Sequence, residues 1–172
     1  LFRSKQFLDI MGHRSFLQQT CDRVKGFVPN TQLWVVTNAQ QEALVREQVG
    51  QIVPHDQILL EPMGKNTAPC IGWAAVEILK KDPEGVMVVL PADHHISNHQ
   101  RFHFNLDIAC GYARDQASLF TIGIPPTHPH TGYGYIEIQE GEESAHPVIS
   151  FTEKPDIDTA QQYLNTGRFR SE

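Results

Sequence analysis

This chain of 172 residues lacks the features that mark several classes of protein. Its three cysteines are widely spaced and odd in number, which matches neither a disulfide framework nor a zinc-ligand pattern and fits a reducing cytoplasm. No segment approaches the ~20 apolar residues that a membrane-spanning helix needs, and no secretory signal pattern opens the chain. A formal net charge of −6 disfavours nonspecific nucleic-acid binding, which needs a basic surface. We therefore expect a cytoplasmic protein that binds neither membranes nor nucleic acids.

What the chain contains is an alternation of short apolar runs and amphipathic segments. Strands are predicted at 33–37, 58–60, 86–90, 119–124 and 148–152, and helices at 15–25, 40–49, 67–80, 99–114 and 159–164. Strands alternating with helices at this spacing predict an α/β fold: a Rossmann-like, mostly parallel twisted sheet with helices on both faces. The length predicts one domain. No Gly-x-Gly-x-x-Gly turn is present, which argues against a dinucleotide-binding dehydrogenase.

The run Glu61–Pro69 lies between a predicted buried strand and a predicted helix. It contains Gly64, which permits close backbone approach, and the amide and hydroxyl of Asn66 and Thr67 at a helix start. Such a turn can present backbone and amide groups to a flat polar ligand such as a nucleobase. On these residues alone, an ordinary capped turn is the commoner interpretation.

Three later segments also place polar groups where strands begin or end. Asp93 follows the apolar run 86–90, and the carboxyl ends of strands are where open α/β sheets bind ligands. Gly132 and Gly134 stand at the entry to an alternating strand, where a ligand can approach the backbone. Glu153 and Lys154 follow the strand at 148–152 and precede a proline. These positions are the candidate site.

Taken in chain order, five segments resemble the mannose-1-phosphate guanylyltransferase family of sugar nucleotidylyltransferases: 5–8, 61–69, 90–94, 131–136 and 151–155. The resemblance implies the nucleotide-diphospho-sugar transferase fold and an enzyme that makes GDP-mannose and pyrophosphate from GTP and mannose 1-phosphate with Mg²⁺. It also implies that 1–172 is a nucleotidyltransferase domain without the family's N-terminal Gly-rich loop and C-terminal part. Assembly into a homo-oligomer is left open.

The resemblance assigns catalytic roles to three residues. Asp93 matches the carboxylate that holds Mg²⁺; without the resemblance, a helix-capping or turn Asp is an even alternative. Lys5 matches a lysine that follows phosphate through the reaction, although a lysine so placed is usually a solvated surface charge. Lys154 matches a lysine that contacts the sugar phosphate.

The resemblance also assigns substrate-binding roles. Gly64, Asn66 and Thr67 should lie against guanine and ribose, with Glu61 supporting their loop. Gly132 and Gly134 should line the sugar pocket, and Glu153 should contact sugar hydroxyls. The plain alternatives are hairpin or bulge geometry for the glycines, and a surface Glu–Lys pair that adds little to stability.

Two other functions remain open from the sequence. One is a sibling nucleotidylyltransferase that uses another base or sugar. The other is a catalytically silent, nucleotide-binding regulatory homologue of the same fold. A zinc site built on His99 and His103 is disfavoured, because no second paired motif accompanies them.

Overall fold

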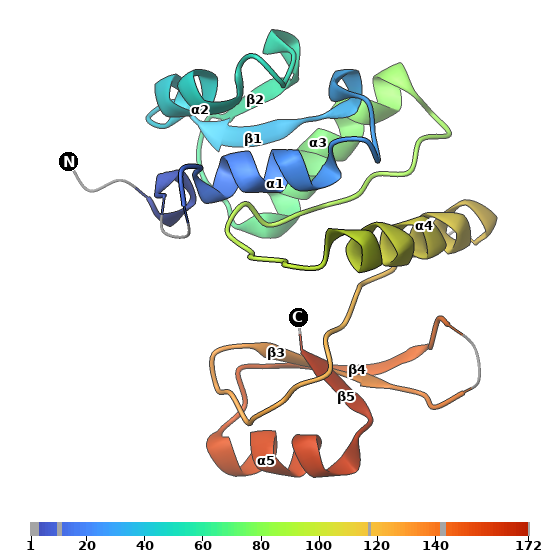
Figure 1. Ribbon diagram of the computed structural model, residues 1–172. Helices are drawn as coiled ribbons and strands as arrows, with labels where there is room; N and C mark the ends of the chain where they lie inside the picture. Colours follow the sequence, from blue (N-terminus) through green and yellow to red (C-terminus); the bar gives the residue numbers. More distant parts are fainter. Residues whose placement is uncertain (1–3, 10–11, 117, 142–143, 172) are drawn as a thin grey trace. The chain divides into compact units, whose positions relative to one another are not determined.

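The computed structural model describes residues 4–9, 12–116, 118–141 and 144–171, and its contacts divide the chain into two compact units, 1–104 and 105–172 (Figure 1). Each unit is treated separately below. The predicted single domain of 1–172 stays a prediction. The elements are the short 3-10 helices η1 (Lys5–Phe7), η2 (Asn30–Gln32) and η3 (His55–Gln57), the helices α1 (Phe16–Val24), α2 (Glu42–Val49), α3 (Thr67–Lys81), α4 (His99–Asp115) and α5 (Ile157–Thr166), and the strands β1 (Val35–Asn38), β2 (Ile58–Glu61), β3 (Gly134–Ile138), β4 (Val148–Glu153) and β5 (Phe169–Ser171).

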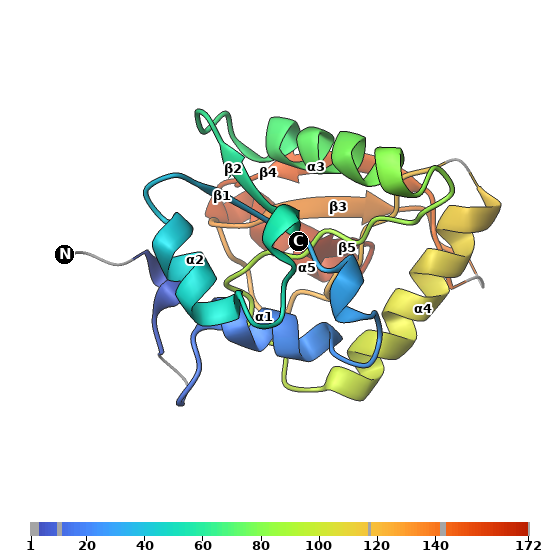
Figure 2. The same cartoon turned by 90° about the horizontal axis from the view of Figure 1, so that it is seen from above.

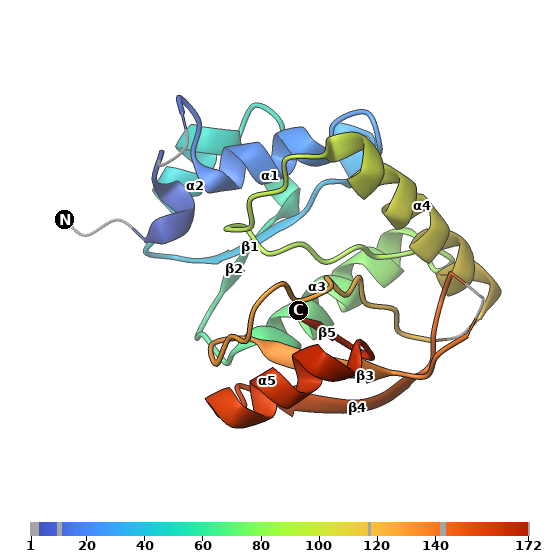
Figure 3. The ribbon, with the colours of Figure 1, turned by 60° about the horizontal axis from the view of Figure 1, so that its bottom comes forward.

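Unit 1 is built on a parallel pair of strands. β1 pairs with β2 in a register that sets Val35 opposite Ile58 and Asn38 opposite Glu61. Figures 2 and 3 show α1 and α2 on one side of this pair and α3 on the other. The predicted α/β class and the parallel pairing with helices on both faces are thereby confirmed in this unit.

The core of unit 1 forms where the apolar faces of α1 and α2 meet β2. Leu17 and Cys21 of α1, Val45 and Val49 of α2, and Ile58 of β2 are all buried in one cluster, which also takes in Phe7 and Val53. The spacing of four residues in each helix places these side chains on one face. α1 begins at a capping box, in which Ser15 and Gln18 satisfy each other's backbone N–H groups.

Unit 2 contains an antiparallel sheet in the order β4-β3-β5, with α5 packed on it. Tyr135 of β3, Ala160 of α5 and Phe169 of β5 are buried together, and Tyr163 of α5 stacks on Phe169 with ring centroids 3.8 Å apart. The aromatic packing fixes α5 against the sheet. This three-stranded antiparallel arrangement was not predicted from the sequence pattern.

Two predicted strands, at 86–90 and 119–124, are not strands in the structure. Residues 86–90 form no hydrogen-bonded pairing with any described strand. Within 119–124, the pairing found in the described structure is an isolated bridge between Ile124 and Ser171. An apolar run indicates that a segment can be buried. A strand also needs a neighbouring strand to which its backbone is hydrogen-bonded. No helix in the described part of the chain is long and apolar enough to cross a membrane.

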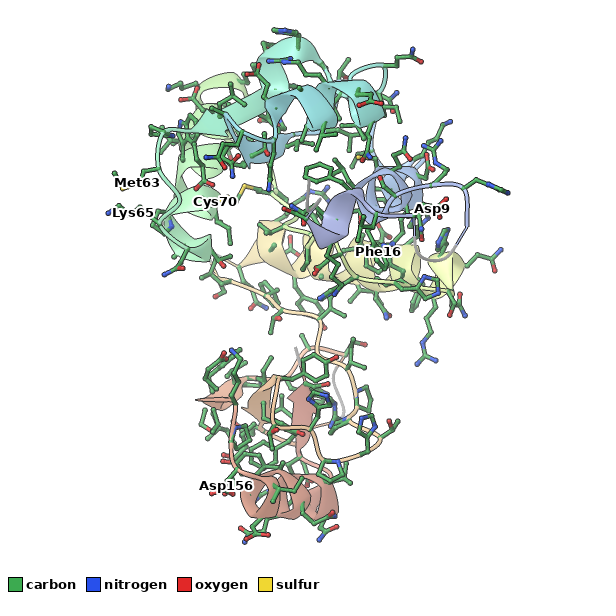
Figure 4. All side chains as sticks on the ribbon, turned by 90° about the vertical axis from the view of Figure 1, so that its left-hand side faces the viewer. Asp9, Phe16, Met63, Lys65, Cys70 and Asp156 are labelled. Carbon is green, nitrogen blue, oxygen red and sulfur yellow. The ribbon has the colours of Figure 1, made fainter. Side chains whose placement is uncertain are left out.

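The start of α5 yields a pH prediction. Asp156, labelled in Figure 4, accepts a hydrogen bond of 2.8 Å from the Thr159 backbone N–H, and this bond lowers the pKa of Asp156 below 3.8. A depressed native pKa stabilises the fold above the unfolded pKa, and this contribution is lost as pH falls through the native value. We expect the Thr159 amide NMR shift to titrate with a midpoint below 3.8.

The control for this titration is Asp156→Asn, which keeps a capping oxygen but removes the charge. The acid transition at Thr159 should disappear in that variant. A midpoint at or above the ordinary Asp value in the unsubstituted protein would contradict the assignment.

Candidate functional site

Lys5 and Asp93 lie 88 residues apart in the sequence and meet in the structure. Lys5 Nζ is 3.2 Å from Asp93 Oδ2, and both side chains remain open to solvent, at 62% and 39% exposure. Lys5 is held in η1 by the buried neighbour Phe7. An exposed ion pair of this kind contributes little to the stability of the fold, so stability alone does not account for the presence of Lys5 and Asp93 at these positions. An ammonium beside a carboxylate at an open rim can bind a phosphate together with a cation.

Hydrogen bonds of Gln41 attach this pair to the carboxyl edge of the parallel strands. Gln41 lies three residues beyond the end of β1, and its N–H donates to Asn38 Oδ1 at 3.0 Å. Its side-chain Nε2 donates to Ser4 Oγ at 2.9 Å, directly before Lys5. Asn38 is level with Glu61 in the β1–β2 register. Lys5 and Asp93 therefore lie near the edge where β1 and β2 end, although residues 86–90 before Asp93 form no strand.

The loop after Glu61 is exposed and open. Gly64, Asn66 and Thr67 are all exposed, and Figure 4 shows Met63 and Lys65 projecting away from the body of unit 1. A Cβ added at Gly64 would meet nothing within 4 Å, so the fold itself does not require glycine there. Asn66 stands at the N-cap of α3 but its side chain makes no capping hydrogen bond. The Asn66 side chain therefore does not satisfy the first N–H groups of α3.

In unit 2 the structure brings together the other predicted residues. The β3–β4 register sets Gly134 opposite Glu153, and the Lys154 N–H donates to the Tyr133 carbonyl at 3.2 Å. Lys154 Nζ forms an ion pair with the carboxylate of Glu153. Pro155, which follows, is buried and fixes the turn. Gly132, Gly134, Glu153 and Lys154 thus share one end of this sheet.

His130 organises the glycine turn in a way that the sequence did not predict. Its Nδ1 accepts a hydrogen bond from the Gly132 N–H at 3.0 Å, and its ring stacks on Tyr133 with centroids 4.3 Å apart. A Cβ at Gly132 would lie 2.9 Å from the imidazole, which explains why glycine is needed there. A histidine two residues before a glycine is too weak a signal to have identified this contact.

Two predicted site residues carry unusual backbone conformations. Among the described non-glycine residues, only Asn66 and Lys154 have positive φ, at 67° and 44°. Asn66 also has ψ of −170°, a region that glycine alone adopts readily. Such a conformation costs about 1–3 kcal/mol and tends to occur at functional sites. The coincidence of both outliers with predicted site residues supports a functional role for each loop.

The donor set limits which metal the site could hold. In the part of the chain that the structure describes, no three His, Cys, Asp or Glu side chains are grouped as a metal cage. Asp93 alone fits a different pattern, because Mg²⁺ is commonly bound by one or two carboxylates together with substrate phosphates. The chain's residues fit a magnesium ion shared with a phosphorylated ligand.

The cysteines do not supply a nucleophile. Burial raises the pKa of the Cys21 thiol to about 11, and burial likewise raises the pKa values of Cys70 and Cys110. A thiol must ionise to act as a nucleophile or a metal ligand. The raised pKa values disfavour the thiolate form of all three cysteines, of which Cys21 and Cys110 are buried and Cys70 is half-buried.

Comparison with protein families and curated proteins gives consistent matches. A family model described as "Nucleotidyl transferase" matches residues 2–170. A mannose-1-phosphate guanylyltransferase of Klebsiella pneumoniae is 39% identical over 170 residues, which cover 96% of this chain and 36% of that protein. The xanthan biosynthesis protein XanB of Xanthomonas campestris is 41% identical over 166 residues, covering 96% of this chain and 35% of its own length. This chain spans about a third of the length of these relatives.

Two solved structures share the fold. A Thermus thermophilus protein, titled a mannose-1-phosphate geranyltransferase, superposes with a TM-score of 0.87 at 28% identity, covering 98% of this chain and 48% of its own. A Helicobacter pylori protein, titled a mannose-6-phosphate isomerase, superposes with a TM-score of 0.79 at 30% identity, covering 98% of this chain and 63% of its own. These superpositions confirm the predicted Rossmann-like nucleotide-sugar transferase fold.

The conformation of Asn66 gives a stability prediction. Because glycine adopts φ of 67° with ψ of −170° without a Cβ clash, Asn66→Gly relieves about 1–3 kcal/mol of strain, from which the entropic cost of glycine, about 0.5–1 kcal/mol, must be subtracted. The free energy of unfolding of unit 1 should therefore rise by up to about 2.5 kcal/mol. Chemical denaturation monitored in unit 1 measures this change. The matched control is Lys65→Gly in the same loop, where φ is not positive and glycine should destabilise by about 0.5–1 kcal/mol. Equal destabilisation by both substitutions would contradict the strained conformation.

Proposed function

This chain belongs to the nucleotidyl transferase family, and from that premise we propose that it is the nucleotidyltransferase part of a cytoplasmic mannose-1-phosphate guanylyltransferase. The proposed reaction transfers GMP from GTP to mannose 1-phosphate and gives GDP-mannose and pyrophosphate. The observation that carries the chemistry is the meeting of Lys5 and Asp93 at the carboxyl edge of the parallel strands. The relatives' names support the choice of substrates.

The chemistry needs positioning and charge neutralisation more than a strong base. A phosphate oxygen of mannose 1-phosphate attacks the α-phosphorus of GTP, and a new phosphorus–oxygen bond forms. The bond from the α-phosphorus to the oxygen that bridges to the β-phosphate breaks, and pyrophosphate leaves with its electron pair. Because the attacking phosphate is already anionic, no proton has to be removed. The main barrier is the approach of two polyanions in line.

Unit 1 would hold the nucleotide. The Lys5 ammonium would neutralise phosphate charge, and its flexible stem would let it follow the phosphate during transfer. Asp93 would hold Mg²⁺, and the chemistry that the bound ion supplies is neutralisation of phosphate charge. Gly64, Asn66 and Thr67 would lie against guanine and ribose, with Glu61 at the end of β2 supporting their loop. The open space at Gly64 and the strained backbone of Asn66 support this assignment.

Unit 2 would hold the sugar phosphate. Lys154 would contact the phosphate of mannose 1-phosphate, and Glu153 would accept hydrogen bonds from sugar hydroxyls. Gly132 and Gly134 would offer backbone donors to the sugar, and the His130 contact would keep the turn at Gly132 in place. The fixed conformation of Lys154 between β4 and the buried Pro155 supports its assignment as a positioned cation.

The test of the reaction is turnover by the intact protein with mannose 1-phosphate, Mg²⁺ and each nucleoside triphosphate in turn. We expect pyrophosphate release and GDP-mannose formation with GTP, at rates at least about 100-fold above those with UTP or dTTP, because a site that hydrogen-bonds one base rejects others. Turnover with UTP or dTTP but not GTP would favour the sibling enzyme. GTP binding without turnover for any substrate pair would favour the silent regulatory homologue.

The control for this experiment is a pair of matched carboxylate substitutions. Asp93→Asn should lower the rate by about 100- to 1,000-fold, because it removes charge stabilisation from the reacting phosphates. Asp56→Asn removes another exposed carboxylate that pairs with a lysine, Lys81, and should leave the rate unchanged. A near-normal rate for Asp93→Asn would remove Asp93 from the metal site.

A second prediction separates the two substrates. Lys154→Gln removes the charge and shortens the side chain by one atom, so it should raise the KM for mannose 1-phosphate about 10- to 100-fold through loss of a charge-assisted hydrogen bond. The KM for GTP should stay within about twofold. Lys80→Gln, at an exposed lysine that pairs with Glu77, serves as the control. Equal losses for both substrates in Lys154→Gln would contradict its proposed role.

A further inference from the structure

Arg23 is a buried arginine without a carboxylate partner. Its residue is only 2% exposed, near the end of α1, and no described acidic side chain forms an ion pair with it. Burial lowers the pKa of its guanidinium below the usual range. Removing a charge from water is unfavourable unless other groups compensate for the lost hydration. The groups that compensate for the lost hydration therefore indicate the structural role of the Arg23 side chain.

The guanidinium reaches from α1 to the backbone of the segment that carries Asp93. Arg23 Nη2 donates to the His94 carbonyl oxygen at 2.5 Å and to Thr20 Oγ1 at 3.4 Å. The Phe102 ring lies 5.7 Å from the guanidinium carbon, within range of a cation–π interaction. Arg23 Nε has no hydrogen-bond partner in the described structure. The strongest contact of this buried charge is thus one backbone carbonyl, 71 residues away.

The backbone of Arg23 is also held in place, by a residue that follows the Asp93 segment in the chain. His103 of α4 donates from Nε2 to the Arg23 carbonyl at 2.5 Å, and its ring lies 5.5 Å from that of Phe27. α4 follows the Asp93 segment in the chain. Arg23 of α1 therefore makes one hydrogen bond to this segment, at His94, and another to the helix that comes after it, at His103. Arg23 is therefore held in place by its main chain as well as by its side chain.

The Asp93 segment has few other polar anchors. For residues 91–97, the hydrogen bonds found within the described structure are the one from Arg23 to His94 and the one from Lys5 to Asp93. Ala92 adds an apolar anchor against the core of unit 1. The Lys5–Asp93 contact is exposed, and Lys5 must give it up to bind a phosphate if it follows that phosphate through the reaction. The Arg23 contact is part-buried, and it fixes the His94–His95 peptide unit, one residue beyond Asp93.

We propose that Arg23 is a positioning residue that sets the backbone of Asp93 through the His94 carbonyl. The inference rests on the proposed function insofar as Asp93 is taken to act on the reacting phosphates. A guanidinium suits this role because it is planar, stays charged when buried and carries several donors on a long stem. A carboxylate that must stay in one place while its lysine partner moves needs an anchor that does not take part in the exchange.

The experiment compares Arg23→Met, Arg23→Lys and Arg14→Met in the intact protein. Methionine keeps an unbranched apolar stem and removes every donor, whereas lysine keeps one charged donor. Arg14 lies just before α1 and pairs with Asp22 on the surface, so Arg14→Met is the matched control. Backbone ¹⁵N relaxation is measured across 92–98 and across α1, α2 and β1, alongside steady-state kinetics with varied GTP and varied Mg²⁺.

In Arg23→Met, we expect the backbone order parameters within 92–98 to fall toward the value of a flexible loop, below about 0.6, with those of α2 and β1 unchanged. The kcat should fall about 10- to 100-fold and the Mg²⁺ concentration for half-maximal rate should rise, while the KM for GTP stays within about twofold. Arg23→Lys should restore part of both effects, and it decides the question if the methionine variant does not fold. Arg14→Met should behave as the unsubstituted protein.

Two outcomes overturn the proposal. One is unchanged order parameters in 92–98 for both Arg23 variants. The other is an equal fall in order parameters throughout unit 1, which would make Arg23 a general stabilising residue. The relaxation measurement does not depend on turnover, so the two proposals fail separately. If the unsubstituted protein transfers no nucleotide, the proposed function fails, whereas normal transfer with unchanged local order removes only the role of Arg23.

Discussion

The candidate site of unit 1 depends on the parallel pairing of β1 with β2. This register sets the end of β1 at Asn38 level with the end of β2 at Glu61. Both carboxyl ends then face one edge, and the loops that leave them must begin there. Gln41, just beyond β1, binds Ser4 and so ties the 3-10 helix of Lys5 to the same edge. A slip of one residue in the register would turn every side chain to the opposite face and would separate these groups.

Conformational strain is concentrated where polar groups must be presented. Asn66 holds a backbone conformation suited to glycine, directly before α3, and Lys154 holds a left-handed conformation directly after β4. Neither residue is buried, so core packing does not explain these conformations. Asn66 instead carries a free amide at an uncapped helix start, and Lys154 carries an ammonium beside Glu153. The remaining packing of each unit must offset this local cost.

Much of the secondary structure could be predicted because it follows from local patterns. The apolar face of α1, the apolar run of β2 and the long helix from Thr67 match the structure within one or two residues. The run at 86–90 was wrongly predicted as a strand, because apolar content does not identify a hydrogen-bonded neighbour. Arg23 was also missed, although it stands seven residues after Phe16 on the buried side of its helix. A charged residue at that spacing was the available signal.

The sequence alone determined which residue types were available and where turns would place them. Strand-end motifs singled out Asn66 and Lys154 as candidates because glycine, proline and capping residues act over a few positions, whereas Asp93 was selected after an apolar run that forms no strand. Only the tertiary structure decided that Lys5 meets Asp93, that Arg23 holds the His94 carbonyl, and that His130 braces Gly132. The first two contacts join residues more than 70 positions apart, and their geometry depends on packing between elements. Local sequence patterns extend over a few residues and therefore cannot predict contacts between residues so far apart in the chain.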